Sequence, residues 1–182
     1  MATGLLKKET TALLVIDVQE RLMPVIHEKE KIFANVNKLL RGAEILSLET
    51  IITEQYPKRL GHTCAEIEVG EGKTLLEKVC FSCMQSEAIT EQLKLTNKKS
   101  LIICGVESHI CVLKTALDAL ENGYEVHVVA DAVSSRTAEN KQLALERMRQ
   151  SGAFIVSMEM VLFALLNEAG TDEFKAISKL IK

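Results

Sequence analysis

The feature that most constrains the fold is the regular alternation of short apolar runs with longer stretches of helical spacing. LIICGV carries no charged residue, as expected of a strand buried on both faces of a parallel sheet. Strands that alternate with helices call for a parallel sheet covered on both faces. Six runs predict strands: TALLVID (11–17), TIITEQ (50–55), LLEKV (75–79), LIICGV (101–106), YEVHVVADAV with its exit loop (124–133) and AFIVS (153–157).

The stretches between these runs predict helices. Apolar residues recur at helical spacing in the first of them, and Ser86 is a candidate N-cap for the second. We expect helices over 30–49, 86–97, 109–122 (stopped by Gly123), 138–152 and from Met158 onward, with a loop over 56–74. The prediction is one three-layer α/β domain over residues 1–182, with a doubly wound, six-stranded parallel sheet.

Size and charge narrow the classes of partner. The 182 residues are enough for one sizeable core, and a formal net charge of -3 gives no general attraction for nucleic acid or an anionic membrane. No apolar run approaches the ~20 residues of a membrane span, and MATGLLKKET lacks the apolar stretch of a secretory signal. Five scattered cysteines fit reduced thiols. We therefore expect a cytoplasmic protein with a small-molecule substrate.

Polar residues gather where the predicted strands end. In doubly wound sheets, ligands bind at the carboxyl ends of the strands, near the point where strand order reverses. Asp17, Lys78 and Cys111 form a chemically coherent set among the residues there. The others are Gln19, Glu54, Gln55, Asp131, Ser134, Ser135 and Arg136.

These three side chains suggest nucleophilic catalysis. A helix N-terminus and a nearby ammonium would both favour the thiolate of Cys111. Asp17 could take the thiol proton and return it to a leaving group, as a general base and then acid. Backbone N–H groups of the turn GVESHIC are natural donors to an oxyanion. This chemistry needs no metal, and the chain has no P-loop or dinucleotide fingerprint, so we expect no cofactor.

The segments ALLVIDVQ, TEQYPKRLG, LLEKVCFSC and ICGVESHICVLKTALDALENGYEVHVVADAVSSR resemble the isochorismatase-like cysteine hydrolases, especially their small single-domain members. The resemblance runs from about residue 10 to residue 165. It implies a six-stranded, Rossmann-like parallel sheet and a triad of Asp17, Lys78 and Cys111. It also implies a cis peptide between Val106 and Glu107, with the N–H groups of Glu107 and Cys111 as the oxyanion hole.

The departures from this family bear on the metal and the substrate. Nicotinamidases of the family hold a metal with an aspartate and two histidines, and have an Asp-Trp-His run after the second strand. TEQYP stands there in this chain, and His62 is alone in its loop, so we expect no metal. The substrate pocket is expected to include Gln19, Gln55, Tyr56 and Phe81, while the substrate itself stays open.

Each of these residues also has a purely structural interpretation. A lone Cys111 is more often a small buried hydrophobic residue, and Asp17 or Lys78 alone could be a cap or a surface charge. Their joint occurrence favours catalysis. Cys80 and Cys83 form a C-x-x-C that could be a redox pair or half a zinc site, although no second half follows.

The remaining thiols and histidines are expected to be structural. Cys104 is expected to be inert core, and Cys64 lies in the loop after Tyr56, where it could approach the pocket. His109 stands two residues before Cys111, and such close neighbours seldom point at each other, so a Cys-His dyad is disfavoured. His127 is expected to be a packed core residue.

The expected function is that of a metal-independent hydrolase acting on a small amide, carbamoyl compound or related metabolite through a covalent intermediate at Cys111. One alternative is a non-catalytic binding or scaffold protein that keeps the fold. Another is an isochorismatase-type vinyl-ether hydrolase, in which the aspartate acts as the acid. We also expect a homo-oligomer, because one C-terminal helix is more apolar than a single buried face requires, with Val161, Leu162, Phe163, Leu165 and Leu166.

Overall fold

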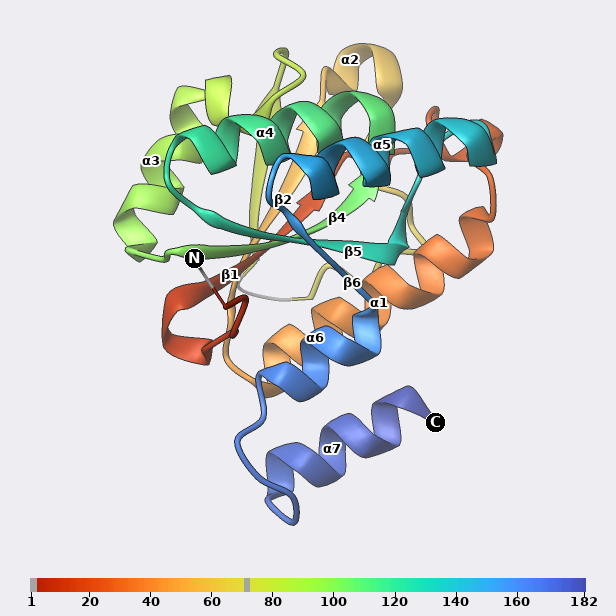
Figure 1. The fold of residues 1–182 in the computed structure, drawn as a ribbon. Helices are drawn as coiled ribbons and strands as arrows, with labels where there is room; N and C mark the ends of the chain where they lie inside the picture. Colours follow the sequence, from red (N-terminus) through yellow and green to blue (C-terminus); the bar gives the residue numbers. More distant parts are fainter. Residues whose placement is uncertain (1–2, 71–72) are drawn as a thin grey trace.

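The computed structural model describes residues 3–70 and 73–182, and its centre is one six-stranded, all-parallel sheet (Figure 1). The strand order is β3-β2-β1-β4-β5-β6, so the order reverses between β1 and β4. This arrangement confirms the predicted six-stranded parallel sheet. The strands are β1 (Thr11–Ile16), β2 (Glu49–Gln55), β3 (Thr74–Lys78), β4 (Ser100–Val106), β5 (Glu125–Ser134) and β6 (Phe154–Val156).

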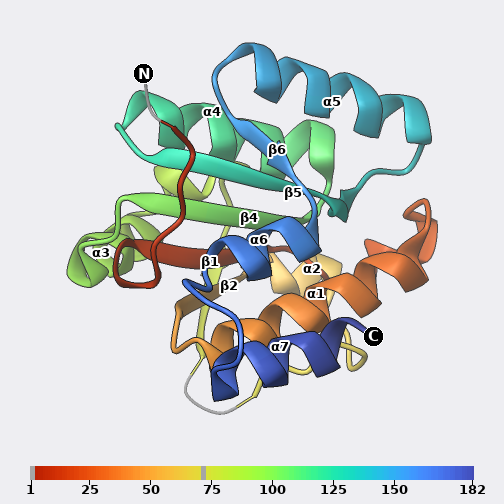
Figure 2. The same cartoon turned by 60° about the horizontal axis from the view of Figure 1, so that its bottom comes forward.

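Helices cover both faces of the sheet, which gives the three predicted layers (Figures 1 and 2). One face is covered by α3 (Glu87–Thr96), α4 (Leu113–Glu121) and α5 (Ala138–Gln150). The other face is covered by α1 (Lys29–Ile45) and α6 (Met158–Ala164), with α7 (Asp172–Ile181) packed on α1 and α6. No helix in the described ranges is both long and apolar enough to cross a bilayer.

The alternation of side chains along each strand divides the core into two clusters. All six residues of β1 are buried, with Leu13 and Val15 in the cluster under α1, and Leu14 and Ile16 in the cluster under α4. Successive side chains of a strand point to opposite faces, so a strand that is apolar throughout fits only between two helical layers. The apolar runs therefore encode the three-layer arrangement directly.

Several predicted boundaries differ from the structure. The first helix ends at Ile45, because Ser47 adopts a left-handed conformation (φ 54°) and turns the chain into β2. Ser86 lies at the start of α3, but its side chain makes no capping hydrogen bond. The predicted loop after β2 contains the short helix α2 (Pro57–Leu60). The first two differences lie at helix ends, where local chain turns outweigh helical spacing.

The C-terminal region corrects the argument for self-association. The helix predicted from Met158 onward ends at Ala164, and α7 follows it as a separate helix. Phe163 packs edge to face against Phe174 of α7, with ring centroids 6.2 Å apart. Leu162 and Leu165 are buried in the core under α1. These apolar side chains are therefore covered within the chain, so this segment does not by itself predict a homo-oligomer.

A glycine sets the distance between the two central strands at their carboxyl ends. Gly105 has a φ of 108°, and a Cβ atom there would lie 2.0 Å from the carbonyl oxygen of Ile16. No side chain fits such a gap, so only glycine allows β4 to approach the end of β1 this closely. The turn that follows β4 is thereby held beside the residues that follow β1.

Candidate active site

Asp17 follows β1 directly and turns its carboxylate toward β2 and β3. It adopts a left-handed conformation (φ 53°), which aspartate tolerates better than most residues, and it is fully buried. Its Oδ1 accepts a hydrogen bond from Thr53 Oγ1 at 2.7 Å, and its Oδ2 accepts one from Lys78 Nζ at 2.6 Å. Both carboxylate oxygens are therefore bound by charged or hydroxyl donors.

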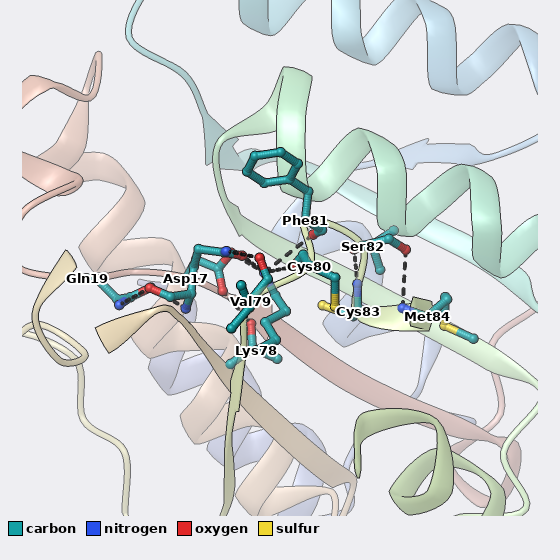
Figure 3. Close-up of polar contacts among 12 residues, drawn as sticks. Asp17, Gln19, Lys78, Val79, Cys80, Phe81, Ser82, Cys83 and Met84 are labelled. Carbon is teal, nitrogen blue, oxygen red and sulfur yellow. Dashed lines mark hydrogen bonds and ion pairs between the residues drawn. The ribbon is translucent and has the colours of Figure 1, made fainter. Parts of the chain in front are cut away.

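Lys78 ends β3, and its ammonium group is surrounded by oxygen atoms (Figure 3). Besides Asp17, Nζ donates to Gln55 Oε1 at 2.7 Å. The carbonyl oxygens of Cys80 and Phe81 lie 3.4 Å from Nζ, because the chain after β3 curls back over the side chain. The Lys78 side chain is completely shielded from solvent. Its ammonium thus serves as a fixed internal charge.

Asp17 and Lys78 shift each other's pKa within this buried site. Burial raises the pKa of Asp17 above its ordinary value, although Lys78 and the Thr53 hydroxyl oppose that shift. For Lys78, burial acts to lower the pKa, but the attraction of Asp17 and the nearby thiols outweighs it, so the pKa is raised. Lys78 therefore stays an ammonium, and Asp17 holds a proton more readily than an exposed aspartate.

Cys111 lies in a π-helical turn, η4 (Ser108–Val112), that leads into α4. Cys111 is 6% exposed. Burial raises the pKa of the Cys111 thiol, the Asp17 carboxylate raises it further, and Lys78 opposes both. The expectation that the helix start and the ammonium would favour a resting thiolate was therefore wrong, because burial outweighs them. The resting group is a thiol whose pKa responds to the Asp17 carboxylate.

The turn between β4 and η4 contains a cis peptide bond between Val106 and Glu107, at the position that the family resemblance implies. The Glu107 carboxylate accepts hydrogen bonds from the Arg136 backbone N–H at 3.2 Å and from Arg136 Nε at 3.1 Å. These contacts join the turn to the end of β5. His109 does not form a dyad with Cys111, because its Nδ1 lies 2.9 Å from Ser135 Oγ.

One protein-family model matches most of the chain. The isochorismatase domain model matches residues 11–160. The chain belongs to the isochorismatase family. A secreted isochorismatase effector of Phytophthora sojae is 43% identical, covering 98% of this chain and 88% of the relative. Isochorismatase domain-containing protein 2 of Danio rerio is 41% identical, covering 98% and 90%.

Several solved structures share the fold closely. The MAR1 ribonuclease of Caenorhabditis elegans superimposes with a TM-score of 0.91 at 37% identity, covering 97% of this chain and 91% of that one. YcaC of Pseudomonas aeruginosa, solved with hexane-2,5-diol and covalent acrylamide, gives 0.90 at 26% identity, covering 99% and 93%. YcaC of Escherichia coli, an octameric hydrolase of unknown specificity, gives 0.91 at 28%, covering 97% and 88%.

The four residues predicted to line an isochorismatase-family pocket fall into two groups. Gln19 and Gln55 are buried, and their amides bind other parts of the chain. Tyr56 and Phe81 are 43% and 51% exposed. Tyr56 lines a hollow of about 340 Å³ beside Lys78, whereas the Phe81 ring points away from Lys78 and lies 5.8 Å from Lys114 Nζ on α4 (Figure 3). The two aromatic residues are therefore the ones that solvent reaches.

The structure adds two residues that the sequence reasoning did not place in the site. Thr53 binds the Asp17 carboxylate, and its alternation with Gln55 along β2 was a signal that both share one face. Cys83 is fully buried, and its backbone N–H donates to Thr115 Oγ1 at 2.9 Å, one helical turn beyond Cys111. Burial raises the pKa of the Cys83 thiol to about 12, although Lys78 opposes that shift.

Cys104, Cys64 and His127 are packed in the core. Cys104 is fully buried in β4, as predicted, and Cys64 is buried in the cluster under α1. His127 is 1% exposed, stacks on Phe154 with centroids 5.0 Å apart and has its Nε2 3.0 Å from Glu125 Oε1. This packing confirms the interpretation of His127 as a core residue. All five cysteines are free thiols.

Glu54 fixes the start of the loop that follows α2. Its carboxylate accepts from the backbone N–H of Thr63 at 2.6 Å and from Thr63 Oγ1 at 2.8 Å, and it lies 3.1 Å from His62 Nδ1. Burial acts to raise the pKa of Glu54, but these bonds outweigh it and lower the pKa. Within residues 3–70 and 73–182, no three metal-ligating side chains gather into one group.

Proposed function

We propose that the chain is a cysteine hydrolase in which Asp17, Lys78 and Cys111 act as a catalytic triad on a small amide, carbamoyl compound or related metabolite. The observation that carries the proposal is the completely buried ion pair between Lys78 and Asp17, 2.6 Å apart, beside a buried thiol. Taking two charges out of water is costly, so such a pair at the reversal point of the sheet is a candidate for function.

The proposed first half-reaction begins with proton transfer from Cys111 Sγ to the Asp17 carboxylate. The thiolate attacks the carbonyl carbon of the substrate, forming a C–S bond, and the carbonyl oxygen takes the negative charge. The oxyanion then collapses, the C–N bond breaks, and Asp17 returns its proton to the leaving amine. The raised pKa of Asp17 suits the first transfer, because a carboxylate that holds a proton more readily is a better base.

In the second half-reaction, water replaces the amine. Asp17 takes a proton from the water while the oxygen attacks the thioester carbon. The oxyanion then collapses, the C–S bond breaks, and Asp17 gives its proton to Sγ, which restores the Cys111 thiol and the Asp17 carboxylate. In this scheme the backbone N–H groups of Glu107 and Cys111 donate to the oxyanion in both halves. Lys78 stabilises the carboxylate form of Asp17 and compensates the charge that develops on sulfur.

Two structural neighbours bear on the substrate and the oligomeric state. We do not propose the ribonuclease activity that the name of the nematode protein states, because a net charge of -3 gives this chain no general attraction for RNA. The octameric state of Escherichia coli YcaC supports a homo-oligomer for this chain. Sedimentation velocity at micromolar concentration is expected to show a species larger than 20.2 kDa, and a purely monomeric profile would contradict it.

Five free thiols also support the proposal that the chain works in the reducing cytoplasm. A fluorescent fusion in the source cells would test this location. Accumulation of the fusion outside the cells, as the name of the Phytophthora sojae effector implies for that relative, would overturn it.

The test of the triad is alkylation of Cys111 by acrylamide, followed by mass spectrometry. The partly exposed Cys80 serves as an internal reference. At neutral pH we expect Cys111 to react at least about tenfold faster than Cys80, because Asp17 accepts its proton during attack. Asp17→Asn should remove that advantage while leaving Cys80 unchanged. Cys111 reacting no faster than Cys80 would overturn the proposed activation.

The substrate class is tested separately by a screen of small amides and carbamoyl compounds for release of ammonia. We expect at least one compound to be hydrolysed by the native chain and not by Asp17→Asn. Selective alkylation of Cys111 without any turnover in a broad screen would favour the binding or scaffold alternative.

A further inference from the structure

The ammonium of Lys78 is held on one side by the catalytic carboxylate and on the other by a neutral amide. Gln55 Oε1 accepts from Lys78 Nζ at 2.7 Å, almost as close as Asp17 Oδ2 at 2.6 Å. An ammonium has three protons to donate, and these two short bonds take two of them. The carbonyl oxygens of Cys80 and Phe81, both 3.4 Å away, share the third direction.

The amide of Gln55 has only one orientation that satisfies its neighbours. Its Nε2 donates to the carbonyl oxygen of Val79 at 2.5 Å, which leaves the amide oxygen facing Lys78. Reversing the amide would place an NH₂ group against an ammonium and a carbonyl oxygen against another carbonyl oxygen. Both polar atoms of this side chain therefore bind the protein.

Gln19 fixes the backbone of Gln55 in turn. The pairing of β1 with β2 ends at Ile16 and Thr53, because the chain turns away at Asp17. Beyond that point the Gln19 amide takes the place of a strand: its Oε1 accepts from the Gln55 N–H at 2.7 Å, and its Nε2 donates to the Gln55 carbonyl at 3.0 Å. Nε2 also donates to the Gly61 carbonyl at 2.6 Å. Gln19 is fully buried.

We propose that Gln55, fixed by Gln19, is a positioning residue that holds the Lys78 ammonium against Asp17, which is then the only carboxylate bound to that ammonium among the described residues. This inference rests on the proposed function and assigns Gln55 a role different from substrate contact. A neutral acceptor orients the ammonium without competing for its charge. The groups with charge or titrating protons that face Asp17 are Lys78, Cys111 and Cys83.

Gln55→Glu tests the proposal, because it keeps the shape of the side chain and adds a second carboxylate to Lys78. The readout is the rate of Cys111 alkylation against pH. The probe is acrylonitrile, which has no amide that could bind Gln55 as a substrate would. In the native chain the rate should fall at acid pH as Asp17 becomes protonated. In Gln55→Glu this acid limb should move upward by about one pH unit, because like charges raise the pKa of a carboxyl group.

Gln55→Met is the second variant, and it removes the acceptor without adding charge. Lys78 then lacks one strong hydrogen bond, so the alkylation rate on the pH plateau should fall about tenfold while the acid limb stays in place. Gln142→Glu on the exposed face of α5 makes the same chemical change away from the site, and its pH profile should match that of the native chain. Thermal unfolding of each variant checks that it is folded.

The outcomes separate this inference from the proposed function. An acid limb in the native chain that is unchanged in Gln55→Glu, together with a native plateau in Gln55→Met, overturns the positioning role. The absence of selective Cys111 alkylation or of any acid limb in the native chain overturns the triad itself. If Gln55→Glu does not fold, the plateau of Gln55→Met decides the question alone.

Discussion

Replacement of Cys111 by alanine is expected to reduce turnover of any amide found in the ammonia screen by at least roughly 10³-fold. Without Sγ no thioester can form, and Asp17 can only activate water directly against the amide. The measurement is the initial rate of ammonia release at saturating substrate, with the Asp17 and Lys78 pair intact. Cys111 is 6% exposed and the alanine is smaller, so circular dichroism should show an unchanged fold.

Cys83→Ala is the matched control for this experiment. Cys83 is also buried, and its thiol also lies within the influence of Lys78. Because the scheme gives it no bond to the substrate, its variant should keep turnover within about threefold of the native chain. Equal losses in the two variants would point to packing near Lys78 rather than to a nucleophile at residue 111.

The vinyl-ether alternative makes a different prediction for the same variant. If Asp17 works as an acid on an enol ether, the thiol need not attack, and Cys111→Ala would keep full turnover of such a substrate. Asp17→Asn would abolish turnover in both mechanisms. Full activity of Cys111→Ala together with an inactive Asp17→Asn would therefore replace the thioester scheme by acid catalysis.

The second large effect concerns stability. Lys78→Met is expected to destabilise the fold by about 3–5 kcal/mol at pH 8, because it leaves the Asp17 carboxylate buried without its counter-ion. The double variant Asp17→Asn/Lys78→Met should recover about 2 kcal/mol or more of that loss, since no unpaired charge remains. Urea unfolding followed by circular dichroism measures all three free energies of unfolding.

The cost of Lys78→Met should depend on pH with a defined sign. Without Lys78 the pKa of Asp17 in the fold rises further above its unfolded value of about 3.9. The free energy of unfolding of Lys78→Met is therefore highest below the unfolded-state pKa of Asp17. It falls as the pH rises through the folded-state pKa of Asp17. The variant should therefore be closer to the native chain at pH 5 than at pH 8. The same cost at both pH values would show that Asp17 is not the group left unpaired.

Lys8→Met is the matched control for the buried pair. Lys8 Nζ lies 2.8 Å from Glu173 Oε2, a separation like that in the site, but the two side chains are 25% and 42% exposed. Water solvates the remaining carboxylate there, so the loss should stay within about 1 kcal/mol at either pH. Comparable losses for Lys8→Met and Lys78→Met would contradict the importance of burial.

The sheet could be predicted from the sequence because each buried strand is a short apolar run with a polar boundary. The position of Asp17 and Lys78 at the same edge of the sheet, after β1 and at the end of β3, followed from the parallel arrangement alone. The helix α7 was missed, although Thr171 caps it by accepting from the Phe174 N–H. Its partners are other helices rather than the sheet, so the strand-helix alternation gave no indication of it.

Sequence spacing did not predict the properties that depend on burial and on the path of the chain. A helix start and an ammonium suggested a low pKa for Cys111, but the depth of the thiol in the fold raises it. Gln19 and Gln55 looked like pocket residues because polar side chains at strand ends often contact ligands. Their actual contacts depend on where β1 turns away from β2, at the left-handed Asp17, and no spacing rule contains that turn.

The contact between Gly105 and Ile16 has a consequence for how such a chain can diversify. The backbone that carries the thiol is fastened to the strand that leads to the carboxylate, so neither can shift alone. Tyr56 and Phe81, in contrast, lie beyond the ends of β2 and β3 with 43% and 51% of their surface exposed. Under the proposed scheme, substitutions of these two side chains would alter which substrates fit, while the spacing between Asp17 and Cys111 stays fixed.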